Sequence, residues 1–394
     1  MHGFTQYTPT RIIFGKETQK QAGELAKSLK ASKVFVVYGG GSVVRSGLLD
    51  EVIASLEEAG LEYMTVGGVK PNPRMSFAKE GVKKAINSGA DLVLAVGGGS
   101  CIDTAKAIAI AAAKPGTDLE EFWSGKVPIE KALPVGVVLT IAAAGSEMSD
   151  SSVITNENGW LKRGYNSSYC RPKFAVMNPE LTMTLPKYQT ASGCVDIMMH
   201  TMERYFNHCD NMELTDGISE HLLRTVMKNA KILMDEPQCY KARAEVMWAG
   251  SLSHNGLMAC GNDGGDWACH QLEHELGGMF DVAHGAGLAA VWGSWARYVC
   301  DALPDRFEQF AVNVMGVENG DDKNAVIQKG IEAMENFFRQ IEMPTDLGGL
   351  NIEVSEDQMK ELALKCSHFG KRTIGCVKKL NQEDIYRIYQ KAAD

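Results

Sequence analysis

The stretch LVLAVGGGSCIDTAKAIAIAAA, residues 92–113, places an apolar run, three glycines, a serine and an alanine-rich segment in direct succession. Its residues 92–96 predict a strand buried on both faces, and residues 101–113 predict a helix. The same order occurs earlier, where VFVVYGGGS at 34–42 leads into an amphipathic segment at 43–59. Alternating strands and helices of this kind are typical of an α/β domain around a parallel sheet.

Further segments continue the alternation of strands and helices as far as about residue 177, and the chain after Pro186 is helical in pattern. Apolar runs at 61–66, 135–140 and 174–177 predict further strands, whereas almost everything after Pro186 has the periodicity of helices. At 394 residues the chain exceeds what one hydrophobic core usually covers. We therefore expect an α/β domain with a Rossmann-like parallel sheet at 1–187 and an all-α domain at 188–394.

The glycine-rich turns indicate a ligand. Gly97, Gly98 and Gly99 let backbone N–H groups approach a diphosphate, and the helix N-terminus behind them favours negative charge. Ser100 is expected to cap that helix, with Asp103 as its capping-box partner. The turn is neither the G-x-G-x-x-G fingerprint nor a P-loop. One such turn alone would be only a tight connection, but two in one α/β domain favour a dinucleotide site.

The composition excludes several classes of protein. With 45% apolar and 23% charged residues the chain is an ordinary globular protein, and its net charge of −9 argues against nucleic-acid or anionic-membrane partners. Ten cysteines without a Cys-x-x-Cys pair indicate reduced thiols, and no segment resembles a signal peptide or a membrane span. We expect a cytoplasmic protein whose partners are small molecules.

A histidine-rich stretch, GNDGGDWACHQLEHELGGMFDVAHGAG at 261–287, carries the strongest chemical signal of the second half. His270 and His274 are four residues apart and share one helical face. Gly277-Gly278 is expected to end that helix, so that a helix-turn-helix can bring His284 back beside His270. Converging neutral imidazoles are a usual ligand set for a transition metal.

An upstream helix expected at 189–206 adds an acid and a fourth histidine. Asp196 and His200 are four residues apart among apolar side chains, where an isolated carboxylate would be costly. The two can pair with each other, or both can bind a metal together with His270 and His284. One aspartate and three histidines suit Fe²⁺ or Zn²⁺ and are too nitrogen-rich for Mg²⁺ or Ca²⁺. The other histidines, including His254, are expected to be surface or satisfied core residues.

Two rival interpretations remain at this point. His270-x-x-Glu273-His274 matches the H-x-x-E-H pattern of a zinc metallohydrolase, in which both histidines bind zinc and the glutamate is the general base. That interpretation leaves the GGGS turns and His284 without a role. A non-enzymatic nucleotide-binding regulator with a structural metal is the other, although a closed structural site needs no cofactor nearby.

Over essentially its whole length the chain resembles the iron-containing (group III) alcohol dehydrogenases, and in particular their butanol dehydrogenase and broad-range aldehyde reductase branch. The segments that carry the resemblance are Gly97-Gly98-Gly99-Ser100 with Asp103, Gly145-Ser146-Glu147, Asn178-Pro179, Asp196-x-x-x-His200, Gly264-Gly265-Asp266-Trp267, His270-x-x-x-His274-Glu275 and His284-Gly285. The chain departs from the family at Ala142–Ala144, where many members have Thr-Gly or similar residues.

The resemblance implies residue roles and an architecture like that of dehydroquinate synthase. The implied metal ligands are Asp196, His200, His270 and His284. His274 would be the extra histidine that faces the nicotinamide without binding the metal, a role incompatible with the hydrolase interpretation. The implied cofactor-binding residues are Gly97, Gly98, Gly99, Ser100 and Asp103, with Thr140 and Lys162 nearby.

The resemblance also implies the reaction, which is hydride transfer between NADP(H) and a small aldehyde or primary alcohol, assisted by one Fe²⁺ or Zn²⁺. The family selects its cofactor at the end of the first strand, where an acid repels a 2′-phosphate. Gly39, Gly40 and Ser42 offer no acid there. We therefore expect NADP(H) to be preferred over NAD(H). A homodimer that pairs through edge strands near Phe4 to Phe14 is implied as well.

Overall fold

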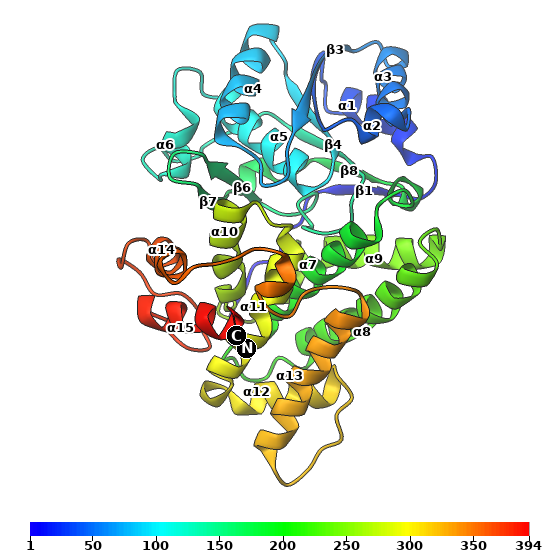
Figure 1. The fold of residues 1–394 in the computed structure, drawn as a ribbon. Coiled ribbons are helices and arrows are strands. Elements are labelled where there is room, and N and C mark those ends of the chain that lie inside the picture. Colours follow the sequence, from blue (N-terminus) through cyan, green and yellow to red (C-terminus); the bar gives the residue numbers. More distant parts are fainter. Residues whose placement is uncertain (394) are drawn as a thin grey trace. The chain divides into compact units, whose positions relative to one another are not determined.

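The computed structural model describes residues 1–393 and divides the chain into two compact units (Figure 1). One unit is Thr8–Thr184, and the other is the chain from Leu185 onward together with Met1–Tyr7. The sequence-based boundary lay between residues 187 and 188. The first seven residues group with the helical unit because the Met1 amino group donates to the Asp210 carbonyl (2.7 Å) and the His2 N–H to the Gly261 carbonyl (2.8 Å).

The first unit is built on a six-stranded parallel sheet with the order β1-β8-β5-β4-β2-β3. Its strands are β1 (Arg11–Phe14), β2 (Lys33–Gly39), β3 (Glu62–Val69), β4 (Leu92–Gly97), β5 (Val135–Leu139) and β8 (Phe174–Met177). Every residue of β4 and β5 is buried, as expected for central strands covered on both faces. The strands expected from the apolar runs are therefore present, and the α/β prediction is confirmed.

Helices and a hairpin complete this unit. They are α1 (Ala22–Ser28), α2 (Ser42–Arg45), α3 (Leu48–Glu58), α4 (Met75–Ser88), α5 (Gly99–Ala112), α6 (Leu119–Trp123) and the antiparallel pair β6 (Ser151–Asn156) and β7 (Leu161–Asn166). The prediction of a single helix at 43–59 is wrong, because Gly47 adopts a φ of 78° and separates α2 from α3.

Both GGGS turns follow neighbouring strands. β2 and β4 pair in parallel, although β3 intervenes in the sequence, because the sheet grows outward from β2 to β3 and then reverses to β4. Ligands of open α/β sheets bind at the carboxyl ends of the strands beside such a reversal. The turns at 39–42 and 97–100 occupy that place.

The second unit is helical. Its helices are α7 (Lys187–Tyr205), α8 (Glu213–Asp235), α9 (Tyr240–His254), α10 (Ala268–Phe280), α11 (His284–Val299), α12 (Pro304–Asn313), α13 (Lys323–Gln340), α14 (Glu356–Cys366) and α15 (Gln382–Ala393). Helix α11 packs against α7, α10, α13 and α15 and is buried almost all round, so it is the core element of this unit. Among residues 1–393, no helix is both long and apolar enough to cross a bilayer.

The expectation that Gly277-Gly278 ends the histidine-rich helix is wrong. Helix α10 continues through both glycines to Phe280 and ends at Asp281, whose φ of 55° is left-handed. Both glycines are buried, and the tertiary packing of α10 outweighs their poor helix propensity, which is about 1 kcal/mol each.

Candidate metal and dinucleotide sites

Three of the four expected metal ligands converge in the helical unit. The Oδ1 atom of Asp196 on α7 lies 3.7 Å from Nε2 of His270 on α10 and 3.5 Å from Nε2 of His284 on α11. One donor atom from each of these residues lies within 4.8 Å of the other two. Ligands bound tetrahedrally at 2.0–2.2 Å stand roughly 3.4 Å apart, so the spacing fits a transition metal.

His200, the fourth expected ligand, contacts Asp196 without joining that three-donor group. Its Nδ1 atom lies 3.2 Å from Asp196 Oδ1 and 3.0 Å from the Asp196 carbonyl oxygen, and its ring centroid lies 4.5 Å from that of His270. Burial lowers the pKa of His200 well below its usual value. Burial thus favours the neutral ring, which is the form that binds a metal.

Two buried atoms in this cluster test whether a cation fits. Asp196 Oδ1 and His270 Nε2 have no hydrogen-bond partner, and both side chains are nearly inaccessible to water. Although burial favours the protonated acid, His200, His284 and His270 hold the pKa of Asp196 well below its usual range. A buried carboxylate that faces imidazole nitrogens in this way matches the donor chemistry of Fe²⁺ or Zn²⁺.

Two glycines of α11 let the ligand helices approach each other. A Cβ on Gly285 would lie 1.9 Å from the Ser192 carbonyl oxygen, so only glycine allows the first turn of α11 to sit against α7. A Cβ on Gly287 would lie 2.8 Å from Cγ of Glu273 on α10. The sequence His284-Gly285-Ala286-Gly287 therefore places His284 against both other ligand helices.

Three residues lie beside the ligands; sequence reasoning missed Glu203 and the position of His254, and it named Glu273 only as the general base of the hydrolase interpretation. Glu203 Oε1 accepts a hydrogen bond from His270 Nδ1 (2.8 Å), and Glu273 Oε2 accepts one from His284 Nδ1. The His254 ring centroid lies 4.1 Å from that of His200, a contact that the expected surface or satisfied-core role did not include. Glu203 follows Asp196 by seven residues, two helical turns, and this spacing was the available signal. His254 gave none.

His274 lies beside the cluster. Its ring centroid is 6.4 Å from that of His270 and 6.0 Å from that of His284, and the side chain is half-buried. Among the described residues, no candidate ligand group contains His270 and His274 together. Glu273, which the hydrolase interpretation uses as general base, binds His284 instead. The geometry therefore does not assemble the H-x-x-E-H site.

The β4–α5 turn of the first unit departs from its expected capping. Helix α5 starts at Gly99, one residue before Ser100, and the N–H groups of Cys101 and Ile102 bond to the Gly98 carbonyl at 3.0 and 3.1 Å. Ser100 therefore lies inside the helix, and the predicted capping box is wrong.

Asp103 belongs to a buried network instead. It accepts hydrogen bonds from Ser146 Oγ (2.6 Å) and the Val153 N–H (2.9 Å). Lys106, which sequence reasoning missed, is fully buried and donates to Ser146 Oγ (2.9 Å) and the Ser151 carbonyl (2.7 Å). Burial lowers the pKa of Lys106. The network fixes the segment after β5 against α5, beneath the glycine turn.

The remaining expected cofactor residues lie in the same unit. The Thr140 N–H donates to the Gly97 carbonyl at 3.1 Å, which ties the end of β5 to the end of β4. Lys162 is buried on β7. Gly39 ends β2 and Ser42 begins α2, with Gly40 between them.

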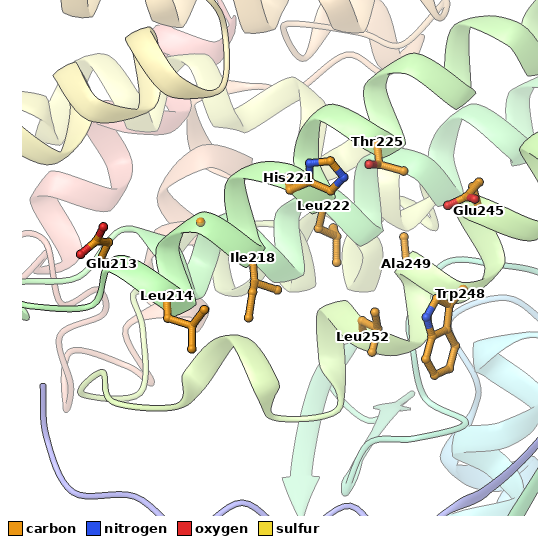
Figure 2. A pocket seen from close by; sticks show the side chains of 11 residues that line it. Glu213, Leu214, Ile218, His221, Leu222, Thr225, Glu245, Trp248, Ala249 and Leu252 are labelled. Carbon is orange, nitrogen blue, oxygen red and sulfur yellow. The ribbon is translucent and has the colours of Figure 1, made fainter.

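An apolar pocket in the helical unit is lined by none of the expected site residues. It has a volume of about 700 Å³ and lies between α8 and α9, where Leu214, Ile218 and Leu222 face Trp248 and Leu252 (Figure 2). It contains none of the predicted ligands, so it adds nothing to the metal site.

Comparisons with known proteins agree with this architecture. Residues 9–179 match the family model described as iron-containing alcohol dehydrogenase, and residues 190–393 match that of the Fe-containing alcohol dehydrogenase family, C-terminal. The chain is 37% identical to NADH-dependent butanol dehydrogenase A of Clostridium acetobutylicum and 34% identical to an NADPH-dependent aldehyde reductase of Escherichia coli, with all of each protein covered.

A solved structure gives the same result. NADH-dependent butanol dehydrogenase A from Thermotoga maritima superposes with a TM-score of 0.96 at 39% identity, covering 100% of this chain and 99% of that one. With both family models matched over nearly the whole sequence, the chain belongs to the iron-containing alcohol dehydrogenase family, in the branch of the butanol dehydrogenases and aldehyde reductases.

Proposed function

We propose that this protein transfers hydride reversibly between NADP(H) and a small aldehyde or primary alcohol, with one Fe²⁺ or Zn²⁺ held by Asp196, His200, His270 and His284. The observation that carries the proposal is the convergence of the buried Asp196 Oδ1 atom with two imidazole Nε2 atoms at 3.5 and 3.7 Å. Such a donor set is what a Lewis-acid metal requires, and the family supplies the nicotinamide chemistry.

The ligand residues would set the charge around a bound metal and the directions from which donor atoms reach it. When bound, a divalent metal polarises a carbonyl oxygen and lowers the pKa of an alcohol hydroxyl. Asp196 brings the one carboxylate of the set, and the histidines bring neutral nitrogens. The burial of Asp196, His200 and His270 keeps bulk water from their donor atoms, which strengthens electrostatic interactions there, whereas His284 is partly exposed.

His274 is proposed to take part in catalysis without binding the metal. Its half-buried ring stands about 6 Å from the rings of two ligand histidines, at 6.4 and 6.0 Å between centroids. From that position the imidazole can exchange a proton with solvent or orient the nicotinamide. Solvent can replace it in proton transfer, so its loss should slow the reaction without removing metal.

The proposed preference for NADP(H) rests on the turn after β2. Gly39, Gly40 and Ser42 place no acid where one would repel a 2′-phosphate, and a Cβ on Gly41 would lie 3.2 Å from Nη1 of Arg45. A guanidinium at that turn can pair with a phosphate. The proposed phosphate contacts at the second turn come from Gly97, Gly98, Gly99 and Ser100, with Asp103, Thr140 and Lys162 beside them.

Assembly as a homodimer and a cytoplasmic location are also proposed. β1 forms one edge of the six-stranded sheet. Phe4 and Tyr7, which precede β1 in the sequence, have exposed aromatic rings. Exposed edges and apolar side chains are common sites of self-association. Among residues 1–393, none of the ten cysteines forms a disulfide, as suits a reducing compartment. Light scattering coupled to size-exclusion chromatography tests the dimer, and a monomer would contradict it.

The activity is tested by mixing metal-loaded protein with butanal and NADPH, then NADH, and following the loss of reduced-nicotinamide absorbance. We expect oxidation of both cofactors, faster with NADPH, and loss of the reaction after chelation with recovery on adding Fe²⁺ or Zn²⁺. Failure to oxidise either cofactor with several short aldehydes would contradict the proposal. His284→Ala should lose metal and activity together, and full retention of both would refute the ligand set.

A further inference from the structure

We infer that two buried carboxylates, Glu203 and Glu273, are positioning residues that aim the ligand histidines at the metal. The inference rests on the proposed metal site and adds to it the residues that set ligand direction. Each carboxylate accepts a hydrogen bond from Nδ1 of one ligand histidine, and in each case the Nε2 atom of that ring faces Asp196.

Glu203 directs His270 from a neighbouring helix. Its side chain on α7 is buried, and its Oε1 atom accepts two hydrogen bonds from the same residue, one from the His270 backbone N–H (2.9 Å) and one from Nδ1 (2.8 Å). The double contact fixes both the first turn of α10 and the rotation of the His270 ring. A single hydrogen bond to the ring would leave the position of the backbone free.

Glu273 directs His284 in the same way. It lies three residues after His270 on α10, is fully buried, and accepts a hydrogen bond from Nδ1 of His284 at the start of α11. An acid of α7 thus orients the histidine of α10, and an acid of α10 orients the histidine of α11. The three ligand helices are linked in series by these two contacts.

The chemistry of the contacts selects one tautomer. An ionised carboxylate can only accept hydrogen bonds, so the nitrogen that faces it carries the proton. In a neutral imidazole the other nitrogen, Nε2, then has a free electron pair. For His270 and His284 that nitrogen lies 3.7 and 3.5 Å from Asp196 Oδ1. Carboxylates in this position also make the imidazole a stronger metal donor.

Gly287 provides room for Glu273. A Cβ on Gly287 would lie 2.8 Å from Glu273 Cγ and 3.4 Å from its Oε1 atom. Because Cγ is close to the backbone of α10, the Glu273 side chain would have to turn away rather than shift only at its tip. Gly287 therefore offers an independent way to disturb Glu273 without altering its chemistry.

The experiment measures Zn²⁺ binding to the full-length metal-free protein by competition with a chromophoric chelator. The variants are Glu203→Ala, Glu203→Gln, Glu273→Ala, Glu273→Gln and Gly287→Ala. We expect each alanine variant of a glutamate to weaken Zn²⁺ binding by about 10–100-fold. The glutamine variants should recover part of the affinity, because the amide oxygen still accepts a hydrogen bond from Nδ1.

A tautomer measurement separates positioning from general stability. Long-range ¹H–¹⁵N spectra of the histidine rings in the Zn²⁺-loaded protein report which nitrogen carries the proton. Glu273→Ala should alter the His284 ring and leave the His270 ring unchanged, whereas Glu203→Ala should do the reverse. A purely structural role would change both rings or neither, and either pattern would overturn the inference.

Two controls and a double variant complete the test. Glu335 is a buried carboxylate of the same unit that pairs with Arg297, and Glu335→Gln should leave Zn²⁺ affinity unchanged. A Cβ added to Gly217 on α8 would have nothing within 4 Å, so Gly217→Ala should also leave it unchanged. Gly287→Ala should weaken binding alone and add little in the Glu273→Ala background.

The outcomes distinguish this inference from the proposed function. Wild-type Zn²⁺ affinity and unchanged ring spectra in both the glutamine and the alanine variants would overturn the positioning role, even if the enzyme reduces aldehydes. Should an alanine variant fail to fold by circular dichroism, the glutamine variants and Gly287→Ala still decide the question. Conversely, the expected Zn²⁺ and tautomer results without aldehyde reduction would support the positioning role and defeat the proposed function.

Discussion

Replacing Gly285 by alanine should cost both stability and metal, because this residue sets the distance between α11 and α7. A Cβ there would lie 1.9 Å from the Ser192 carbonyl oxygen, whereas ordinary contacts begin at 3.4 Å, so the backbones must separate by 3.4 − 1.9 = 1.5 Å. Overpacking of a buried contact usually costs about 1–3 kcal/mol. Since the opposing atom is backbone, we expect about 3 kcal/mol or more, roughly 6–12 °C in the melting temperature of a unit this size.

Gly285→Ala should reduce the metal content of the protein more strongly than it reduces the stability of the fold. His284 adjoins Gly285, and metal–ligand distances tolerate only about 0.2 Å of change. A displacement on the scale of 1.5 Å would therefore remove His284 from the ligand set. The assay measures metal per chain by atomic spectroscopy after dialysis against a limiting chelator, alongside thermal unfolding of the metal-free protein.

Gly217→Ala is the matched control for that experiment. It is also a helical glycine of the same unit, but nothing lies within 4 Å of its Cβ position. Alanine there should stabilise the protein by about 0.5–1 kcal/mol and leave its metal content unchanged. Full metal occupancy and an unchanged melting temperature in Gly285→Ala would refute the close-approach reasoning.

Three further predictions concern cofactor, catalysis and pH. Gly39→Asp should weaken NADPH far more than NADH in steady-state kinetics, since a Cβ there makes only an ordinary 3.4 Å contact with Cys101 Sγ; equal weakening would contradict the 2′-phosphate argument. His274→Ala should keep its metal while kcat for aldehyde reduction falls about 100-fold, and loss of metal would instead make His274 a ligand. Burial, aided by the charge of Glu203, raises the pKa of Asp266 to about 7. A raised carboxyl pKa favours the folded state at low pH, so this group should lower stability by up to about 4 kcal/mol between pH 4 and 8. Asp266→Asn should flatten the dependence of melting temperature on pH, and an unchanged slope would disprove the assignment.

The elements of the sheet could be predicted because each strand is an uninterrupted apolar run. β4 and β5 are buried along their whole length, so composition alone identifies them. The start of α5 could not be predicted at the same precision. Both Gly98 and Ser100 suit a helix start, and the observed hydrogen bonds to the Gly98 carbonyl decide between them.

For the metal site too, the sequence predicted some features and left others open. A spacing of four residues predicted that Asp196 and His200 share one helical face, and that His270 and His274 share another. It could not predict which of His270 and His274 faces Asp196. That choice depends on how α10 lies against α7, where Glu203 accepts hydrogen bonds from the backbone N–H and Nδ1 of His270. Contacts between residues distant in sequence, such as His254 with His200, lie beyond any local pattern.

The buried acids explain why the histidine-rich stretch functions only as part of the whole helical unit. Burial alone would lower the pKa of His270, but the nearby carboxylates of Asp196 and Glu203 raise it to about 9, which favours a proton on Nε2 when no cation is bound. A metal that binds Nε2 must displace that proton, so binding at neutral pH should release it. The same carboxylate that orients His270 thus also stabilises its protonated form, and tight metal binding depends on the added charge of the metal outweighing that competition.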